Sequence, residues 1–403
     1  MKKLQNSLKC FEKIAIFTVF CQVIQKSAEN SAPKTAEQKS LNYCPVFCKI
    51  EFMNSKKHFS GYIIFAAAFC IAYILFAVKP LGKEYQFEPK WKIDVTNPRV
   101  SENSGNEPIL PFKLGQAMGY FTPSGKVTNF ITFPQKASIS KSGYTFYSFN
   151  NSSATFFAPD GKELFKSSQS GFPMIGEDQV FMFLPGGCSF SMCDESGKSK
   201  WEYSGPVPIT AFSSSPAGTA VGFADGNICQ FEPDGNLLQR FAPGGSEIPV
   251  ILGVAISSDG NYVASVCGQN RQRFVLAKKD GAQTKIISHE FLDSTSTNQM
   301  LVKFSADDKT VYFNSGNILG IANVKTGKIK HLKIEGQAIS IQESEKCFFI
   351  LTKSGEKYNV YTIEPFATFI GRFSFEAESA FIQVYENNLY VGKNSTISCI
   401  EIK

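Results

Sequence analysis

The sequence predicts an all-β fold, a β-propeller preceded by an N-terminal transmembrane helix, and two observations carry this prediction. The first is a glycine-centred turn that recurs along most of the 403 residues. Its glycines are Gly125, Gly161, Gly197, Gly235, Gly281 and Gly327, at intervals of 36, 36, 38, 46 and 46 residues. A repeat of this period is typical of the four-stranded blade of a propeller. The second observation is a run of twenty uncharged residues, Phe59 to Val78.

The composition agrees with many short, half-buried strands. The chain has 38 phenylalanines, 31 glycines and only 2 tryptophans. Aromatic residues favour strands, whereas glycine, serine and asparagine favour tight turns. The formal net charge of +6 is spread along the chain without a run of five like charges. This distribution argues against nucleic acid as a partner.

A second set of turns lies between the glycine turns and predicts seven hairpins. Each hairpin supplies the first two strands of a blade, a third strand follows, and the glycine turn leads into a fourth. The hairpins are expected at residues 139–149, 174–184, 212–223, 254–266, 302–313, 339–351 and 381–391. Seven hairpins predict seven blades.

The ends of the repeat region suggest how the ring closes. The last blade has no fourth strand because the chain stops at Lys403, whereas an extra strand, Lys126 to Phe133, follows the first glycine turn. Pairing the two would protect the edges that an open array exposes. One further strand, Gln116 to Thr122, has no place in this scheme, so a ring of eight blades is the alternative.

The uncharged segment 59–78 is long enough to cross a bilayer as a helix. The segment is flanked by lysines, Lys56 and Lys57 before it and Lys79 and Lys83 after it. Its sequence offers neither a convincing signal-peptidase site nor a lipoprotein cysteine. It is therefore predicted to be an uncleaved single-pass anchor. Residues 1–58 form an N-terminal extension, and the basic stretch after Met53 suggests that translation begins there.

Residues 79–115 carry five prolines among charged and small polar residues and are predicted to be a linker with at most one docked strand, around Trp91. The propeller domain is expected to span 116–403. Lysine and arginine counts on the two sides of the anchor are similar. A short basic tail before a lone anchor favours export of the rest, which places the propeller on the extracytoplasmic side of the cytoplasmic membrane.

The repeats carry local motifs of known propellers. Two segments resemble the inner hairpin of WD40-like repeats: ISSDGNYVA at residues 256–264 and FSADDKTVY at residues 304–312. A third segment, SGKSKW at residues 196–201, is similar to the end of a quinoprotein repeat. The chain thus resembles the bacterial WD40-like, YVTN-like and quinoprotein-like propeller superfamily from about Gly115 to Lys403. The resemblance implies the architecture and leaves the activity open. No Trp-Asp dipeptide occurs, which is a departure from eukaryotic WD40 proteins.

The sequence offers no catalytic constellation. Histidine occurs only at 58, 289 and 331, too few for nucleophile and base arrangements or histidine metal sites. The Asp-Gly pairs are hairpin turns without calcium-loop spacing, and Cys44 and Cys48 lack a second cysteine pair. Five cysteines lie within or beside predicted strands: Cys193, Cys229, Cys267, Cys347 and Cys399. We therefore expect no catalytic residue, no metal site and no cofactor.

The long loop around Asn270, Arg271, Gln272 and Arg273 is the one candidate partner-binding feature, because propeller loops lie on the rims. The leading hypothesis is a non-enzymatic, membrane-tethered propeller that binds envelope proteins. The alternative is a propeller that holds a small ligand or cofactor in its central channel, as quinoproteins do. A third hypothesis, an outer-membrane assembly scaffold of the lipoprotein kind, would need an acylated cysteine.

Overall fold

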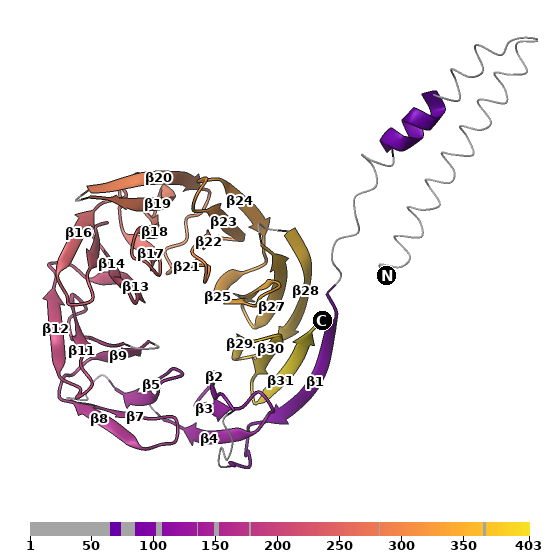
Figure 1. Cartoon of the computed structure of the whole chain (residues 1–403). Helices are drawn as coiled ribbons and strands as arrows, with labels where there is room; N and C mark the ends of the chain where they lie inside the picture. The colour runs from indigo at the N-terminus through magenta and orange to yellow at the C-terminus, as the bar shows by residue number, and fades with distance from the viewer. Residues whose placement is uncertain are drawn as a thin grey trace, which may run out of the picture. The chain divides into compact units, whose positions relative to one another are not determined.

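The computed structural model describes residues 65–73, 85–101, 107–134, 136–148, 153–176, 179–281, 283–365 and 368–403. The chain divides into two units, Met1–Pro80 and Leu81–Lys403. The second unit is a ring of antiparallel sheets around a central axis (Figure 1), and we call the region about this axis the channel. The described residues form eight sheets, each of which is one blade.

The strands follow one another around the ring in chain order. The first blade holds β2 (Leu110–Leu114), β3 (Ala117–Phe121) and β4 (Val127–Thr132). The next three hold β5 (Lys136–Ile139), β6 (Tyr144–Tyr147), β7 (Ala154–Phe157) and β8 (Glu163–Ser167); β9 (Phe172–Ile175), β10 (Val180–Phe183), β11 (Ser189–Cys193) and β12 (Ser199–Ser204); and β13 (Ile209–Ser215), β14 (Gly218–Phe223), β15 (Ile228–Phe231) and β16 (Leu237–Phe241).

The remaining four blades complete the ring. They hold β17 (Ile251–Ile256), β18 (Tyr262–Cys267), β19 (Gln272–Asp280) and β20 (Gln283–Leu292); β21 (Val302–Phe304), β22 (Thr310–Ser315), β23 (Ile318–Asn323) and β24 (Ile329–Lys333); β25 (Gln337–Glu343), β26 (Phe348–Ser354), β27 (Lys357–Glu364) and β28 (Thr368–Glu376); and β29 (Ala380–Tyr385), β30 (Asn388–Lys393), β31 (Thr396–Ile402) and β1 (Phe87–Asp94). In each complete blade the first strand faces the channel and the fourth faces outward (Figure 1).

All seven predicted hairpins are confirmed as the first two strands of the four-stranded blades. The preference for seven blades is wrong, because β2, β3 and β4 form an eighth sheet that holds the strand left without a place. We call this sheet the incomplete blade, and the sheet of β29, β30, β31 and β1 the closing blade.

The ring closes through β1, and the predicted closure by Lys126 to Phe133 is wrong. That segment is β4 and pairs with β3, whereas β1 pairs antiparallel with β31 from Phe87 opposite Ile402 to Asp94 opposite Thr396. Both β1 and β2 lie inside residues 79–115, so the docked strand around Trp91 is present and the propeller begins earlier in the chain than the expected boundary at 116.

The recurring turns need glycine for a steric reason. Gly235 has a φ of +91°, a conformation that other residues rarely adopt, and a Cβ atom there would lie 2.5 Å from the ring of Trp201 in the preceding blade. Asp234 accepts a hydrogen bond from the Asn236 backbone N–H at 3.1 Å and holds the turn. The turn therefore also serves as a contact between neighbouring blades.

The core lies between the blades and is built largely from aromatic rings. Phe274 and Phe313, from neighbouring blades, are fully buried and stack with ring centroids 3.9 Å apart. A second aromatic group, Phe190, Trp201 and Phe231, joins the blade of β9 to β12 to the blade of β13 to β16. Packing of flat rings between twisted sheets explains why the chain uses so much phenylalanine.

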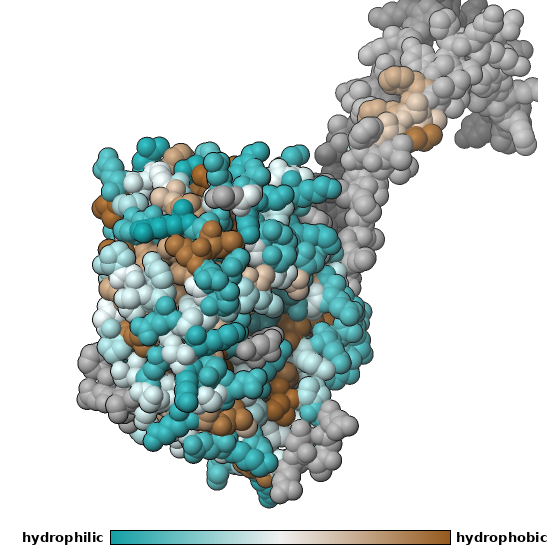
Figure 2. Space-filling model, turned by 60° about the vertical axis from the view of Figure 1, so that its left-hand side comes forward, coloured by the Kyte–Doolittle hydropathy of each residue, from teal (hydrophilic) through white to brown (hydrophobic). Residues whose placement is uncertain are grey.

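The described part of the first unit is a helix at residues 65–73. The rest of the predicted anchor, the extension before it and the proposed start at Met53 lie outside the described residues. None of the helices in the described ranges has the combination of length and hydrophobicity that a membrane span requires. In Figure 2, hydrophilic residues cover most of the visible side of the propeller, and hydrophobic residues form separate patches there.

Candidate functional site

Three lysines from distant parts of the chain meet at the central channel. Lys113 lies in β2, Lys141 in the turn after β5, and Lys303 in β21. They line a pocket of about 480 Å³ together with residues of β25 and β29, and we call it the lysine pocket. Its described lining includes serine and glutamine side chains and no carboxylate. A concave surface of this size is large enough to hold a ligand or a partner's side chains.

Backbone carbonyls position two of these lysines. The Lys113 Nζ donates to the Ala137 carbonyl at 2.6 Å, and the Lys303 Nζ donates to the Ile341 carbonyl at 2.8 Å. Partial burial lowers the pKa of the Lys113 ammonium. These hydrogen bonds fix the direction of both side chains.

Sequence analysis missed these lysines. Lys113 stands between Phe112 and Leu114, and Lys303 between Val302 and Phe304, so each looks like the solvent-facing position of an alternating strand. They could have been identified as lysines on the innermost strand of a blade. This would have required the correct strand order around the ring, and the prediction placed β2 in the linker.

Two further pockets have different chemistry. One of about 430 Å³ lies among the first strands β9, β13, β17 and β21, and its walls are mainly apolar, including Phe172, Met174, Phe212 and Leu252. The other, of about 710 Å³, lies where the closing blade meets the incomplete blade. Its described lining holds no ionisable side chain, so it offers no acid, base or charged ligand contact.

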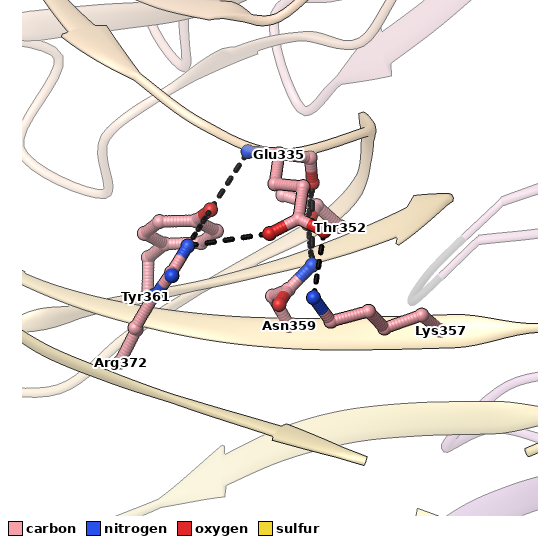
Figure 3. A network of polar contacts seen from close by, with 6 residues as sticks. All are labelled: Glu335, Thr352, Lys357, Asn359, Tyr361 and Arg372. Carbon is pink, nitrogen blue, oxygen red and sulfur yellow. Dashed lines mark hydrogen bonds and ion pairs between the residues drawn. The ribbon is translucent and has the colours of Figure 1, made fainter. Parts of the chain in front are cut away.

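A polar network surrounds Glu335, in the connection between β24 and β25 (Figure 3). The Glu335 carboxylate accepts hydrogen bonds from the Lys357 Nζ at 2.7 Å and the Arg372 Nη1 at 3.4 Å. The backbone of Glu335 is also held, because its N–H donates to the Tyr361 hydroxyl and its carbonyl accepts from the Thr352 hydroxyl. The hydrogen bond from Lys357 holds the pKa of Glu335 below its usual value. A carboxylate held ionised between two cations is a weak base, so the network anchors the connection.

Replacing Glu335 by glutamine should therefore lower stability in a pH-dependent way. The folded-state pKa of Glu335 is depressed, so its contribution is present above the unfolded-state pKa and is lost as the pH falls through the folded-state pKa. The urea midpoint of Glu335→Gln should be slightly below that of the wild type at pH 7 and equal to it near pH 3. Glu376→Gln, at an exposed carboxylate of the same sheet, is the control. A gap that persists at pH 3 would contradict this assignment.

The histidines lie apart. His331 in β24 is half-exposed and its Nε2 contacts the Glu290 Oε1 at 2.8 Å. His289 in β20 is exposed, and its ring lies at 76° to the ring of Phe291 with centroids 6.2 Å apart. Within the part of the chain that the structure describes, no three His, Cys, Asp or Glu side chains form a group that could hold a metal. His58, Cys44 and Cys48 lie outside the described residues.

The loop expected to bind a partner is largely engaged within the chain. Gln272 is fully buried, and the Arg273 Nη1 donates to the Pro243 carbonyl at 3.0 Å. The guanidinium groups of Arg271 and Arg273 lie 4.5 and 5.6 Å from the ring centre of Phe291. These contacts give the loop a structural role in covering Phe291.

The cysteines of the strands are buried free thiols. Burial raises the pKa values of Cys193 and Cys267 to about 11 each. Because the reactive thiolate fraction falls tenfold for each unit of pKa, both thiols should react with iodoacetamide at least about a hundredfold more slowly than an ordinary exposed thiol. Peptide mass spectrometry at pH 7.5 should find Cys188, which is partly exposed, modified before Cys193 and Cys267. Equal rates at Cys188 and Cys193 in the folded chain would contradict the placement of these strands.

Known proteins resemble this chain over most of its length. A family described as "beta-propeller protein" matches residues 53–403. An uncharacterized protein of Treponema pallidum is 28% identical over 366 residues, which cover 88% of this chain and 97% of that protein.

Two solved structures share the fold. BamB from Moraxella catarrhalis aligns with a TM-score of 0.54 and 14% identity over 79% of this chain and 98% of BamB. The computationally designed Ika8 protein aligns with a TM-score of 0.54 and 11% identity over 76% of this chain and 99% of Ika8. Likeness at such identities shows the fold alone. The family match spans well over half of the chain, and the chain therefore belongs to this family of β-propeller proteins.

Proposed function

We propose that this protein is a non-enzymatic scaffold that binds other proteins at the lysine pocket of its channel. The observation that carries the proposal is a pocket of about 480 Å³ at which the strands β2, β5, β21, β25 and β29 of separate blades converge. Strands held in a closed ring make a rigid surface, and a rigid surface loses little conformational freedom when it binds a partner.

We further propose that residues 59–78 tether the propeller to the cytoplasmic membrane and that the propeller works among envelope proteins outside the cytoplasm. Support comes from the uncharged run itself and from the described helix within it, where Phe65 and Phe69 are 72% and 62% exposed. Large apolar side chains left in contact with water favour a membrane as their surroundings.

Photo-crosslinking in living cells tests the scaffold. Benzoylphenylalanine replaces Gln383 at the lysine pocket in one variant and Lys200 on the outer strand β12 in a matched control. The proposal predicts a discrete, higher-mass adduct that forms from position 383 and is absent from position 200. No adduct from position 383, or the same adduct from both positions, would contradict it.

Two measurements test the tether. The full chain should stay with the membrane fraction after alkaline carbonate extraction, and a variant without residues 59–78 should be released. A membrane-impermeant amine reagent applied to cells with a permeabilised outer membrane should modify exposed propeller lysines such as Lys198. Protection of Lys198 until the inner membrane is broken would reverse the proposed topology.

A second candidate function is the binding of a small ligand or cofactor in the channel, and the apolar pocket of about 430 Å³ favours it. Ligand sites of this volume and character are common in proteins. A chromophore that stays with the purified chain, or a rise in Tm on addition of calcium, would support this candidate over the scaffold.

A further inference from the structure

Two connections pair with each other where the blade of β13 to β16 meets the blade of β17 to β20. The first, residues 242–250, leads from β16 to β17, and the second, residues 268–271, leads from β18 to β19. Two backbone hydrogen bonds join them: from the Gly268 N–H to the Val250 carbonyl at 2.8 Å, and from the Gln269 N–H to the Ile248 carbonyl at 3.1 Å. We call these two connections the paired loops.

The paired loops pack closely beside Phe291, near the end of β20. Gly245 has a φ of +97°, and a Cβ atom there would lie 2.8 Å from the Arg273 Cδ and 3.4 Å from the Phe291 ring. The Phe291 side chain still has 46% of its surface exposed, and Ile248 in the first loop has 48% exposed. Two large apolar side chains are therefore presented to solvent from loops that are held in place.

Arg271 is the member of the second loop whose donors are free. The residue is exposed, and its guanidinium lies 4.5 Å from the centre of the Phe291 ring. Within the described ranges, which run without a gap from 179 to 281 and from 283 to 365, this guanidinium has no hydrogen-bond or ion-pair partner. Contact with an aromatic ring leaves the N–H groups of a guanidinium available, and two of them can bind one carboxylate.

The charges around the paired loops are mixed. Arg273 lies beside the same ring as Arg271, whereas Glu247 in the first loop accepts a hydrogen bond from the Asn270 amide at 3.4 Å and Asp293 follows the end of β20. Nucleic acids and anionic membranes bind through summed positive charge, so a surface with similar numbers of acids and bases suits them poorly. Arginine beside exposed aromatic and aliphatic side chains is typical of the centre of a protein interface.

We infer that the paired loops form a docking surface for a different protein, which places a carboxylate against Arg271 and an apolar side chain against Phe291 and Ile248. Charge complementarity identifies the partner, because the free guanidinium needs an anion and the apolar side chains around it favour a carboxylate that is surrounded by apolar groups. The inference goes beyond the proposed function, since no residue of the paired loops lines the lysine pocket.

Photo-crosslinking in living cells tests whether this surface docks a protein. Benzoylphenylalanine replaces Ile248 in the full chain, alone or together with Arg271→Gln. The matched control is Lys278→Gln, which removes a cation that also lies over a ring, 5.6 Å from the centre of Tyr262, at the other end of β19. We expect a discrete protein adduct from position 248. Its yield should fall at least about tenfold with Arg271→Gln and stay unchanged with Lys278→Gln.

Carbodiimide coupling tests the chemistry of the contact. Arg271→Lys keeps the positive charge and supplies a primary amine, which a carbodiimide joins to a carboxylate in contact with it. Mass spectrometry of treated cell fractions should find position 271 coupled to an aspartate or glutamate of the protein that is caught from position 248, and Lys278 not coupled to that protein. An adduct from position 248 that persists with Arg271→Lys, and an unchanged urea midpoint of Arg271→Gln, guard against a folding defect.

Three results would overturn the inference: no adduct from position 248, an equal yield with Arg271→Gln, or coupling of position 271 only to carboxylates of this chain such as Glu247. A lipid, a nucleic acid or a second copy of this chain as the crosslinked species would also overturn it. An adduct from position 383 without one from position 248 would remove this surface and leave the scaffold at the lysine pocket standing. The reverse result would support this surface and contradict the lysine pocket as the scaffold's binding site.

Discussion

A chain that lacks residues 1–94 is expected to fail to close its ring, whereas a chain that begins at Leu81 and keeps β1 should fold. Loss of β1 removes all the pairs with β31 from Phe87 to Asp94 and exposes the β31 edge to other chains. It also removes Trp91, whose ring lies against Phe121 of the incomplete blade and Tyr390 of the closing blade. Size-exclusion chromatography and near-UV circular dichroism should show aggregation and loss of fixed aromatic packing in the shorter chain alone.

A synthetic peptide covering residues 85–96 should restore the ring in trans, because β1 pairs only with β31 among the described strands. Rescue is expected to raise the fraction of monomer and to return the near-UV signal. The same peptide with Trp91→Ala should rescue poorly. If the chain without residues 1–94 is monomeric and unfolds with an unchanged midpoint, closure through β1 is wrong.

Truncation of Phe313 to alanine should give the largest loss of stability from a single substitution in the core. The Phe313 ring is fully buried, stacks on Phe274 at an interplanar angle of 9° and covers Gly320, where a Cβ atom would lie 2.0 Å from it. Phenylalanine to alanine in a close-packed core costs about 3–5 kcal/mol, because burial is lost and a cavity remains. Urea unfolding at pH 7 measures the loss as a lower midpoint.

Phe373→Ala is the control for Phe313→Ala. Phe373 is 38% exposed on the outer strand β28, so its truncation should cost about 1 kcal/mol or less. The double variant with Phe274→Ala should lose less than the sum of the two single variants, by about 1 kcal/mol, since the rings stack on each other. Equal losses at positions 313 and 373 would show that the interface between these blades is misplaced.

The sequence predicted much of this fold because its local signals are strong and repeated. Turns such as Pro233-Asp234-Gly235 and the alternating hairpins around residues 254–266 each carry enough information to place two strands. The incomplete blade was not predicted. The number of blades was predicted from the seven hairpins that lie between the glycine turns, and this sheet has no such hairpin among the described residues. The strand that pairs with β31 was predicted wrongly, because the choice between β1 and β4 depends on pairing between segments about 300 residues apart.

The lysine pocket could not be predicted in the same way. Lys113, Lys141 and Lys303 are separated by up to 190 residues, and only the curvature of the ring brings them together. The features that the sequence did single out, the Arg271–Arg273 loop and the two described histidines, turned out to be used in contacts within the propeller or to lie apart. Turns and strands can be predicted from composition and local sequence pattern. The residues that line the channel also depend on the number of blades and on the strand order within them.

Hydrogen exchange at two adjacent amides of β2 tests the strand order of the incomplete blade most directly. Among the described strands β2 pairs only with β3, and Phe112 is opposite Gly119 in a hydrogen-bonded pair, whereas the Lys113 N–H points to the other edge of β2. The account predicts slow exchange at Phe112 and fast exchange at Lys113. Strong protection of Lys113 would show that another strand covers this edge and would contradict the account.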